Sequence, residues 1–155
     1  MTRIVYARET HLAPMAALMA RSPLLRRYRV TARGAKASLA EALRERDLVI
    51  AAVDGDGVVG LAWVIITRAL DRAAYLRLLL VAETHQARGL GAAMLARVER
   101  EARVSRCRHL VLLVTKTNRR ARSFYERHGY AHVGDLPGFV RPGIAESLYL
   151  KSWRA

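Results

Sequence analysis

The spacing of apolar residues changes along the chain between the two-residue period of strands and the longer period of helices. The segment RIVYAR, from Arg3 to Arg8, alternates and is β-branched enough for a first strand. The runs DLVIAAV and VVGLAWVIIT predict two strands joined by a tight turn at residues 54–57, because Asp-Gly pairs tolerate the positive φ of hairpin turns. The segment AYLRLLLV, residues 74–81, is apolar at nearly every position, as expected for a strand covered on both faces.

Segments with helical spacing separate these predicted strands. After the first strand, Thr10 or His11 could cap a helix whose apolar side contains Leu12, Met15, Leu18 and Met19. A loop, RSPLLRRYRVTARG, precedes a short helix predicted over Lys36 to Arg46. Between Gly89 and Val104, one helical stripe contains Leu90, Met94, Val98 and Ala102. The remaining segments predict a strand at HLVLLVT, a helix at RRARSFYERHG that Gly129 ends, and strands near YAHVG and IAESLYLKS. This order of elements indicates a mixed α/β or α+β protein.

Length and composition favour one domain over residues 1–155. A chain of 155 residues with 52% apolar side chains can bury a substantial core and is short for two ordinary domains. No apolar run approaches the roughly 20 residues that cross a bilayer, and the start MTRIVYARETH lacks the apolar segment of a secretion signal. We therefore expect a cytoplasmic protein. Its single cysteine, Cys107, cannot form an internal disulfide.

The net charge of +14 comes from 27 basic and 13 acidic residues, and such a surface attracts polyanions. The arginines are scattered, however, without a block of five or six, and richness in arginine and alanine is also typical of a GC-rich coding sequence. An arginine-rich nucleic-acid binder is therefore an alternative and not the main prediction. No cluster of His, Cys and Asp has metal-ligand spacing, so no metal is predicted.

Two glycines, Gly89 and Gly91, stand where an apolar strand gives way to an amphipathic helix. Such a turn leaves main-chain N–H groups pointing outward, and the helix dipole adds partial positive charge there, so it can bind a phosphate. A Cβ would hold the phosphate away from the amides. A dinucleotide fingerprint is excluded because Met94 occupies the position of its third glycine, and no Gly-Lys-Ser/Thr run of a P-loop exists. A helix that merely begins after a flexible turn is the alternative.

Two motifs together point to one family. Residues 86–91 have the form Gln-x-x-Gly-x-Gly/Ala, which resembles the coenzyme motif of the GCN5-related N-acetyltransferase (GNAT) superfamily. A second motif of that family has the form Asn-x-x-Ala-x-x-Phe/Leu-Tyr-x-x-x-Gly-Phe/Tyr. Its fixed positions are met by Asn118, Ala121, Phe124, Tyr125, Gly129 and Tyr130. The order of elements from Arg3 to Ser152 also fits, so the resemblance covers nearly the whole chain.

The resemblance implies a GNAT fold, a mixed and mainly antiparallel sheet of six or seven strands with about four flanking helices. It implies acetyl-CoA as co-substrate and no metal, with the pantetheine arm paired to the edge of the fourth strand and the diphosphate held by the glycine turn. The residues implied to bind the coenzyme are Leu79, Leu80, Val81, Gln86, Ala87, Arg88, Gly89, Leu90, Gly91, Ala92 and Asn118. Asn118 could contact the pantetheine, cap the following helix, or do both.

The resemblance further implies transfer of an acetyl group to a primary amine by direct attack within a ternary complex. The family's tyrosine at the position of Tyr125 often protonates the leaving thiolate, which is general acid catalysis. The alternative for Tyr125 is an aromatic core residue beside Phe124. A non-catalytic sensor of acyl-CoA is an alternative for the whole chain.

A protonated amine cannot attack until it loses a proton, and the usual bases of the family are missing here. Many members supply a base six residues before the position of Val81, which here is Tyr75. Ribosomal-protein acetyltransferases tend to carry a glutamate five residues before the motif asparagine, which here is Leu113. The remaining candidates for proton acceptor are Glu83, His85 and Glu146.

The acceptor is predicted to be a small molecule or an amine antibiotic, because Leu113 replaces the glutamate of the protein-modifying branch. A protein N-terminus or a lysine is the alternative. Tyr75 and Arg77 share one face of the fourth strand, where they line the acceptor site or pack at a strand edge. In the family the first helices and last strands choose the acceptor, which here means Ser22 to Gly34, with Tyr28, and GDLPGFVRPGIAES. A homodimer is left open, since dimers are frequent among similar proteins.

Overall fold

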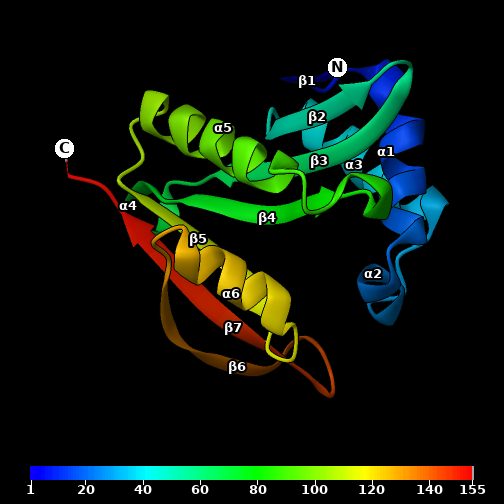
Figure 1. Cartoon of the computed structure of the whole chain (residues 1–155). Helices are drawn as coiled ribbons and strands as arrows, with labels where there is room; N and C mark the ends of the chain where they lie inside the picture. The colour runs from blue at the N-terminus through cyan, green and yellow to red at the C-terminus, as the bar shows by residue number, and fades with distance from the viewer. Residues whose placement is uncertain (155) are drawn as a thin grey trace. The chain divides into compact units, whose positions relative to one another are not determined.

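The computed structural model describes residues 1–154, and seven strands form one mainly antiparallel sheet within them (Figure 1). The strands are β1 (Thr2–Tyr6), β2 (Leu48–Asp54), β3 (Gly57–Ile66), β4 (Ala74–Val81), β5 (His109–Thr115), β6 (Ala131–Arg141) and β7 (Ile144–Ser152). Their order in the sheet is β1-β2-β3-β4-β5-β7-β6, with β4 and β5 parallel. The predicted mixed fold with six or seven strands is thereby confirmed.

Four helices of nine residues or more occur in the described part of the chain, as predicted. They are α1 (Glu9–Arg21), α3 (Ala32–Arg44), α5 (Leu90–Val104) and α6 (Arg119–Arg127). Two short segments, α2 (Pro23–Arg27) and α4 (Ala69–Arg72), and a 3₁₀ turn, η1 (Glu83–His85), complete the set. Segment α4 contains Leu70 and Asp71 at φ of 51° and 56°, so it is a left-handed turn and not a regular helix.

The chain forms two compact units. Unit 1 comprises Met1–Ile65 and Leu78–Arg100, and unit 2 comprises Ile66–Arg77 and the chain from Glu101 onward. Strand β4 and helix α5 each begin in one unit and end in the other. The organisation as one domain over residues 1–155 stays a prediction.

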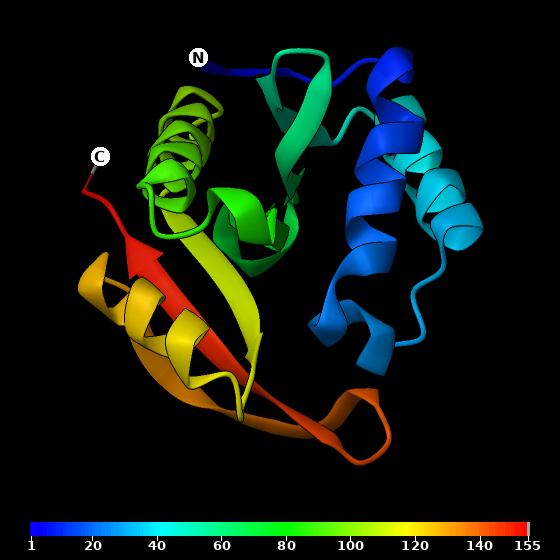
Figure 2. The ribbon, with the colours of Figure 1, turned by 45° about the vertical axis from the view of Figure 1, so that its right-hand side comes forward.

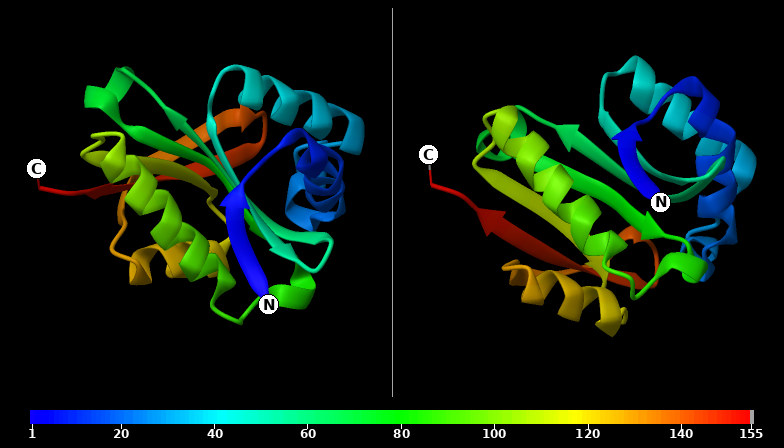
Figure 3. Two further views of the ribbon diagram at one scale, coloured as in Figure 1. Left: turned by 90° about the horizontal axis from the view of Figure 1, so that it is seen from above. Right: turned by 45° about the horizontal axis from the view of Figure 1, so that its top comes forward.

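In unit 1, helices α1 and α3 lie side by side (Figure 2), and β1 runs antiparallel beside β2 (Figure 3). All four residues of the predicted apolar side of α1 are buried, and Met15 of α1 and Leu39 of α3 are fully enclosed. The β2–β3 hairpin turns at Gly55, which has φ of 60°, so the Asp-Gly prediction is confirmed.

Helix starts in unit 1 differ from the predicted ones because the caps differ. Helix α1 begins at Glu9, with Arg8 at the cap position, and His11 Nδ1 accepts a hydrogen bond from the Arg8 N–H at 3.0 Å. Helix α3 begins at Ala32 and not at Lys36, because the Thr31 hydroxyl accepts from the Gly34 N–H at 3.1 Å. The first residues of α3, at positions 32–34, are exposed and include no large apolar side chain, so hydrophobic spacing did not reveal them.

The predicted loop RSPLLRRYRVTARG contains helix α2. Ser22 caps it by accepting from the Leu25 N–H at 3.3 Å, and Pro23 occupies the first helical position, where its missing N–H costs nothing. The sequence did contain this start signal, but five residues are too few for a visible apolar stripe.

In unit 2, β7 pairs antiparallel with both β5 and β6, and Ala74–Leu76 of β4 pair parallel with Leu110–Leu112 of β5. Helix α6 runs along this part of the sheet (Figure 1). Gly129, at φ of 88°, ends α6 as predicted. Strand β6 extends to Arg141, well beyond the predicted YAHVG, because register shifts after His132 and Leu136 let it follow β7 to the hairpin turn.

Gly60 of β3 lies where unit 1 is most tightly packed. A Cβ there would lie 2.9 Å from Met94 Sδ of α5, 3.2 Å from the Leu80 carbonyl oxygen of β4 and 3.3 Å from the Ala52 Cβ. We expect Gly60→Ala to lower the free energy of unfolding by about 1–3 kcal/mol, as overpacking does. Denaturant unfolding followed by circular dichroism measures it.

Gly134→Ala is the matched control, because nothing lies within 4 Å of a Cβ at that position. Its unfolding free energy should stay within about 0.5 kcal/mol of the parent value. Equal stability of the two variants would contradict the packing described around Gly60.

Candidate active site

The glycine turn of unit 1 exposes main-chain amides in front of α5. An α-helix provides no internal partner for its first amides, which here belong to Gly89, Leu90, Gly91 and Ala92, and the first helical hydrogen bond runs from the Ala93 N–H to the Gly89 carbonyl at 3.0 Å. Residues 87–89 are exposed and residues 90–92 are partly buried. The arrangement has the form that the sequence predicted for an anion site, and the binding of an anion there stays a prediction.

The backbone of this turn is left-handed at two positions. Gly89 has φ of 79°, and Ala87 has φ of 59°, which costs a residue with a Cβ roughly 1–2 kcal/mol. Gly91, by contrast, lies within the helix, so its value is the missing Cβ beside the amides. Sequence reasoning attributed the unusual backbone to the glycines and missed Ala87.

Gln86 closes the turn onto the preceding strand. Its side-chain Nε2 donates to the Val81 carbonyl oxygen at 3.0 Å, bridging the end of β4 and the start of the turn. A carbonyl oxygen has two lone pairs, so Val81 can still accept a second hydrogen bond. The glutamine of the motif therefore shapes the turn, and contact of its side chain with a phosphate stays a prediction.

His85 ties the same turn to the β2–β3 hairpin. Its Nε2 lies 2.9 Å from Asp54 Oδ2, and its Nδ1 lies 2.8 Å from the Thr84 hydroxyl oxygen. The hydrogen bond from His85 holds the pKa of the Asp54 carboxyl below its ordinary value. Both ring nitrogens of His85 are thus occupied, while Glu83 is exposed on η1.

Asn118 caps helix α6 in unit 2. Its side-chain Oδ1 accepts from the Ala121 N–H at 3.2 Å, which satisfies one of the first amides of the helix. The capping role allowed by the sequence is therefore present in the structure. Contact with the pantetheine stays a prediction.

Tyr125 is buried on α6 and 8% exposed. Its ring packs edge-to-face against Phe124, at 5.1 Å between centroids, and against Tyr130, at 5.6 Å. Burial raises the pKa of the Tyr125 hydroxyl far above its ordinary value, so the group keeps its proton at neutral pH. The raised pKa also makes the hydroxyl a weaker acid than an exposed tyrosine, so the packing fits the alternative of an aromatic core residue, and the acid role stays a prediction.

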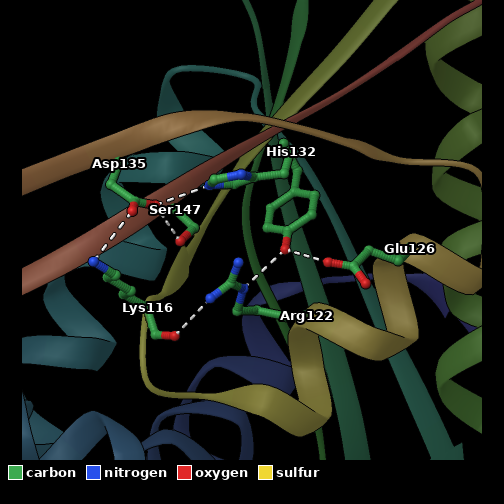
Figure 4. Close-up of polar contacts among 7 residues, drawn as sticks. Lys116, Arg122, Glu126, His132, Asp135 and Ser147 are labelled. Atoms are coloured by element: carbon green, nitrogen blue, oxygen red, sulfur yellow. Dashed lines mark hydrogen bonds and ion pairs between the residues drawn. The ribbon is translucent and has the colours of Figure 1, made fainter.

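A polar clamp joins α6 to β7 (Figure 4). Arg122 Nε donates to the Tyr149 hydroxyl at 2.9 Å, and that hydroxyl donates to Glu126 Oε1 at 2.8 Å. Arg122 also donates to the Lys116 carbonyl at 3.2 Å. Tyr149 is fully buried, and Glu126 directly follows Tyr125, so the clamp fixes the turn of α6 that carries the predicted acid. Sequence reasoning missed it, although a tyrosine inside the apolar strand segment was a signal.

Asp135 gathers a second polar cluster on the same part of the sheet (Figure 4). It accepts from the Ser147 hydroxyl at 2.7 Å, and it lies 2.9 Å from His132 Nε2 and 3.3 Å from Lys116 Nζ. These donors, with Ser147 first, hold the pKa of the Asp135 carboxyl far below its ordinary value.

The predicted acceptor residues fall in different units. Tyr75 and Arg77 lie on β4 in unit 2, and burial raises the pKa of the Tyr75 hydroxyl, an effect that the Arg77 charge opposes and the Glu146 carboxylate strengthens. Glu146 is 3% exposed. Tyr28 lies in unit 1 at the end of α2, and its role stays a prediction.

The remaining candidate side chains have local partners. His109 Nδ1 lies 2.8 Å from the Ser152 hydroxyl, and His128 Nδ1 lies 2.6 Å from the Phe124 carbonyl oxygen. Burial raises the pKa of the Cys107 thiol, an effect that the Arg72 charge opposes. Among residues 1–154, no group of three His, Cys, Asp or Glu side chains could hold a metal ion, and no helix is long and apolar enough to span a membrane.

The model of the acetyltransferase (GNAT) family matches residues 18–130, well over half of the chain. The chain therefore belongs to the GNAT family and is an acetyltransferase. A search of curated proteins finds no significant match.

Solved structures share the fold across the whole chain. An N-acetyltransferase from Staphylococcus aureus has a TM-score of 0.81 at 16% identity, with 98% of each chain covered. A ribosomal-protein-alanine N-acetyltransferase from Brucella melitensis has a TM-score of 0.79 at 19% identity, covering 97% of this chain and 99% of that chain. An aminoglycoside 6'-N-acetyltransferase complexed with coenzyme A has a TM-score of 0.80 at 17% identity, with coverages of 97% and 96%. At these identities the likeness shows the fold.

The cluster at Asp135 predicts a pH dependence of stability. A carboxyl whose folded pKa is depressed contributes stability above its unfolded pKa of about 3.9, and this contribution is lost as the pH falls below that value. Asp135→Asn should therefore unfold at lower denaturant concentration than the parent at neutral pH. The gap between the two unfolding midpoints should narrow below about pH 4. A gap of constant size from about pH 7 to pH 3 would contradict the assigned contacts.

Proposed function

We propose that this acetyltransferase uses acetyl-CoA to acetylate the primary amine of a small molecule, by direct attack in a ternary complex. The observation that carries the proposal is the turn of exposed amides in front of α5, on residues that match the family's coenzyme motif. The left-handed backbone at Ala87 and Gly89 and the missing Cβ at Gly91 leave room for an anion to reach the amides. The family's donor and the chain's own geometry thus support the same ligand.

The coenzyme's diphosphate is assigned to the amides of residues 87–92, with Gln86 and Arg88 at its margin. Its pantetheine arm is assigned to the edge of β4 at Leu79 to Val81, with Asn118 as a further contact. Bound there, acetyl-CoA supplies an activated thioester carbonyl. The protein's residues then orient the acceptor amine and move protons.

Tyr125 is assigned as the acid that protonates the departing sulfur. A tyrosine hydroxyl is protonated at neutral pH even at its ordinary pKa of about 10, so a proton is available when the thiolate forms. The clamp between Tyr149, Arg122 and Glu126 supports this assignment, because it holds the helical turn on which Tyr125 lies.

A small-molecule acceptor is favoured because Leu113, a partly buried side chain on β5, stands where ribosomal-protein acetyltransferases tend to carry glutamate. Structures of both branches share the fold at similar TM-scores, so the fold alone supports neither. The side chain at position 113 therefore carries the choice. The cytoplasmic location stays a prediction from the sequence.

A thiol-release assay with acetyl-CoA and a panel of amines tests the proposal. We expect release that depends on a small primary amine, with the acetylated product identified by mass spectrometry. Release that requires a peptide N-terminus or lysine would move the acceptor to proteins. Coenzyme binding without release for any acceptor would favour an acyl-CoA sensor, and tight nucleic-acid binding without coenzyme binding would favour the arginine-rich binder.

Tyr125→Phe removes the proposed proton donor while keeping the aromatic packing. We expect kcat to fall by about 10²- to 10⁴-fold, the usual contribution of general acid catalysis, with coenzyme affinity unchanged in calorimetry. Tyr130→Phe is the matched control, since Tyr130 is also buried and the family motif accepts phenylalanine there. Full activity of Tyr125→Phe would leave Tyr125 with the core role only.

A further inference from the structure

The pairing of the strands in unit 2 determines which side chains share the face of the sheet on which Glu146 lies. Residues paired across neighbouring strands point to the same side, and side chains along each strand alternate between sides. Tyr75 pairs with Val111 and Val111 with Leu150, while Glu146 pairs with Thr115 of β5 and Leu136 of β6. This face, called the Glu146 face, carries the titratable residues Tyr75, Arg77, His109, Arg141 and Glu146, together with Val111, Leu113, Thr115, Leu136, Leu148 and Leu150.

Helix α6 belongs to the opposite face. Tyr149 and Ser147 alternate with Glu146 along β7, and the Tyr149 hydroxyl contacts Arg122 and Glu126 of α6. Ser147 contacts Asp135, its pairing partner on β6. The polar clusters of Figure 4 therefore lie on the far side of the sheet from Glu146.

Glu146 is the one carboxylate among the described residues of the Glu146 face, which is otherwise mostly apolar. It is 3% exposed, although glutamate is rarely so buried, because removing a charge from water is costly. Its direct neighbours on the adjoining strands are Thr115 and Leu136, so a cationic group that reaches this face would meet a single carboxylate among mostly apolar side chains.

The position of Glu146 relative to Leu113 is informative. Leu113 pairs with Leu148, so Glu146 on β7 is the diagonal neighbour of Leu113 on β5 and points to the same side. Tyr75, the other position at which a base was expected, lies on this face as well. Position 113 thus carries no carboxylate in this protein, but Glu146 provides one at the diagonally neighbouring position on β7.

The other two candidates for proton acceptor are less suited. Glu83 is exposed on η1, and His85 lies beside it and contacts Asp54 of the β2–β3 hairpin. Both residues also belong to the segment that shapes the coenzyme turn of unit 1. Glu146 alone combines burial with the face that carries Tyr75 and Leu113.

Resting on the proposed acetyl transfer, we propose that Glu146 accepts the proton that the acceptor ammonium must lose before it attacks. The neutral amine then forms the C–N bond with the thioester carbonyl carbon, and the C–S bond breaks. Tyr125 gives its proton to sulfur, and the second proton lost by nitrogen restores the Tyr125 hydroxyl. Glu146 afterwards releases its proton to water, so one amide, one thiol and one proton are formed.

Glu146→Gln tests this role because it keeps the shape of the side chain and removes its basicity. At neutral pH we expect kcat/KM for an alkyl amine to fall by about 10²- to 10⁴-fold. The loss should shrink as the pH approaches the amine's pKa of about 10, since the acceptor then arrives neutral. An aromatic amine, which is neutral at pH 7, should be acetylated by Glu146→Gln at nearly the parent rate. A merely structural role would reduce both kinds of amine equally at every pH.

At each pH the measurement is the ratio of kcat/KM of the parent to kcat/KM of Glu146→Gln. The titration of any other group affects both proteins alike and cancels in this ratio. The groups concerned on the Glu146 face are Tyr75 and Arg77 of β4, His109 of β5, and Arg141 of β6, the partner of Ile144. Glu41→Gln is the matched control, because Glu41 is exposed on α3 and should leave the rates unchanged.

A carboxylate exchange separates the base from its scaffold. Glu146→Leu should lose activity, and the double variant Glu146→Leu with Leu113→Glu should regain at least part of it, because the carboxylate returns to the same face. If Glu146→Gln shows a pH-independent loss, or no loss, while the parent acetylates amines, the assignment of Glu146 is wrong and the proposed function stands. If the parent releases no thiol with any amine, the proposed function itself fails.

Discussion

The proposed function depends on one interaction, the hydrogen bonds that the main-chain amides in front of helix α5 would donate to the diphosphate of the coenzyme. To act as the proposed anion site, these amides require the turn before them to keep its left-handed backbone at Ala87 and Gly89. Two side-chain contacts hold that shape: Gln86 on the Val81 carbonyl, and His85 on Asp54. The partial positive charge proposed to attract the diphosphate comes from the backbone at the start of α5. The surrounding side chains therefore serve mainly to hold the turn in place.

Proton chemistry is assigned to two buried groups of unit 2, Tyr125 on α6 and Glu146 on β7. Tyr125 keeps its proton because its hydroxyl is removed from water, and the clamp on Tyr149 fixes its helix from the α6 side of the sheet. Glu146 lies on the other side, on a face without another described carboxylate. Strand β7 therefore positions both groups. It carries Glu146 itself, and its Tyr149, which points to the other side of the sheet, holds the helix that carries Tyr125.

Much of this could be predicted from sequence. The strands, the hairpin at Gly55, the glycine turn before α5 and the Asn118 cap each depend on local spacing or on a residue type with a known backbone preference. Features set by pairing between distant segments were missed. The alternation of side chains along a strand shows which residues share a face, but not which strand lies beside it or in what register. The register that makes Glu146 the diagonal neighbour of Leu113 is of this kind, as is the contact of Tyr149 with Arg122. The first turn of α3 was missed because it contains alanine, arginine and glycine and no large apolar side chain.

Calorimetric titration of the protein with phosphopantetheine and with pantetheine tests the central claim most directly, since the two ligands differ by one phosphate of the coenzyme's diphosphate. Charge-assisted hydrogen bonds contribute about 1.5–3 kcal/mol each, so the phosphate should improve affinity by about 10- to 100-fold. Replacing Gly89, whose φ of 79° disfavours a side chain, by alanine should remove most of that gain. Equal affinities of the parent protein for the two ligands would contradict a phosphate site at this turn.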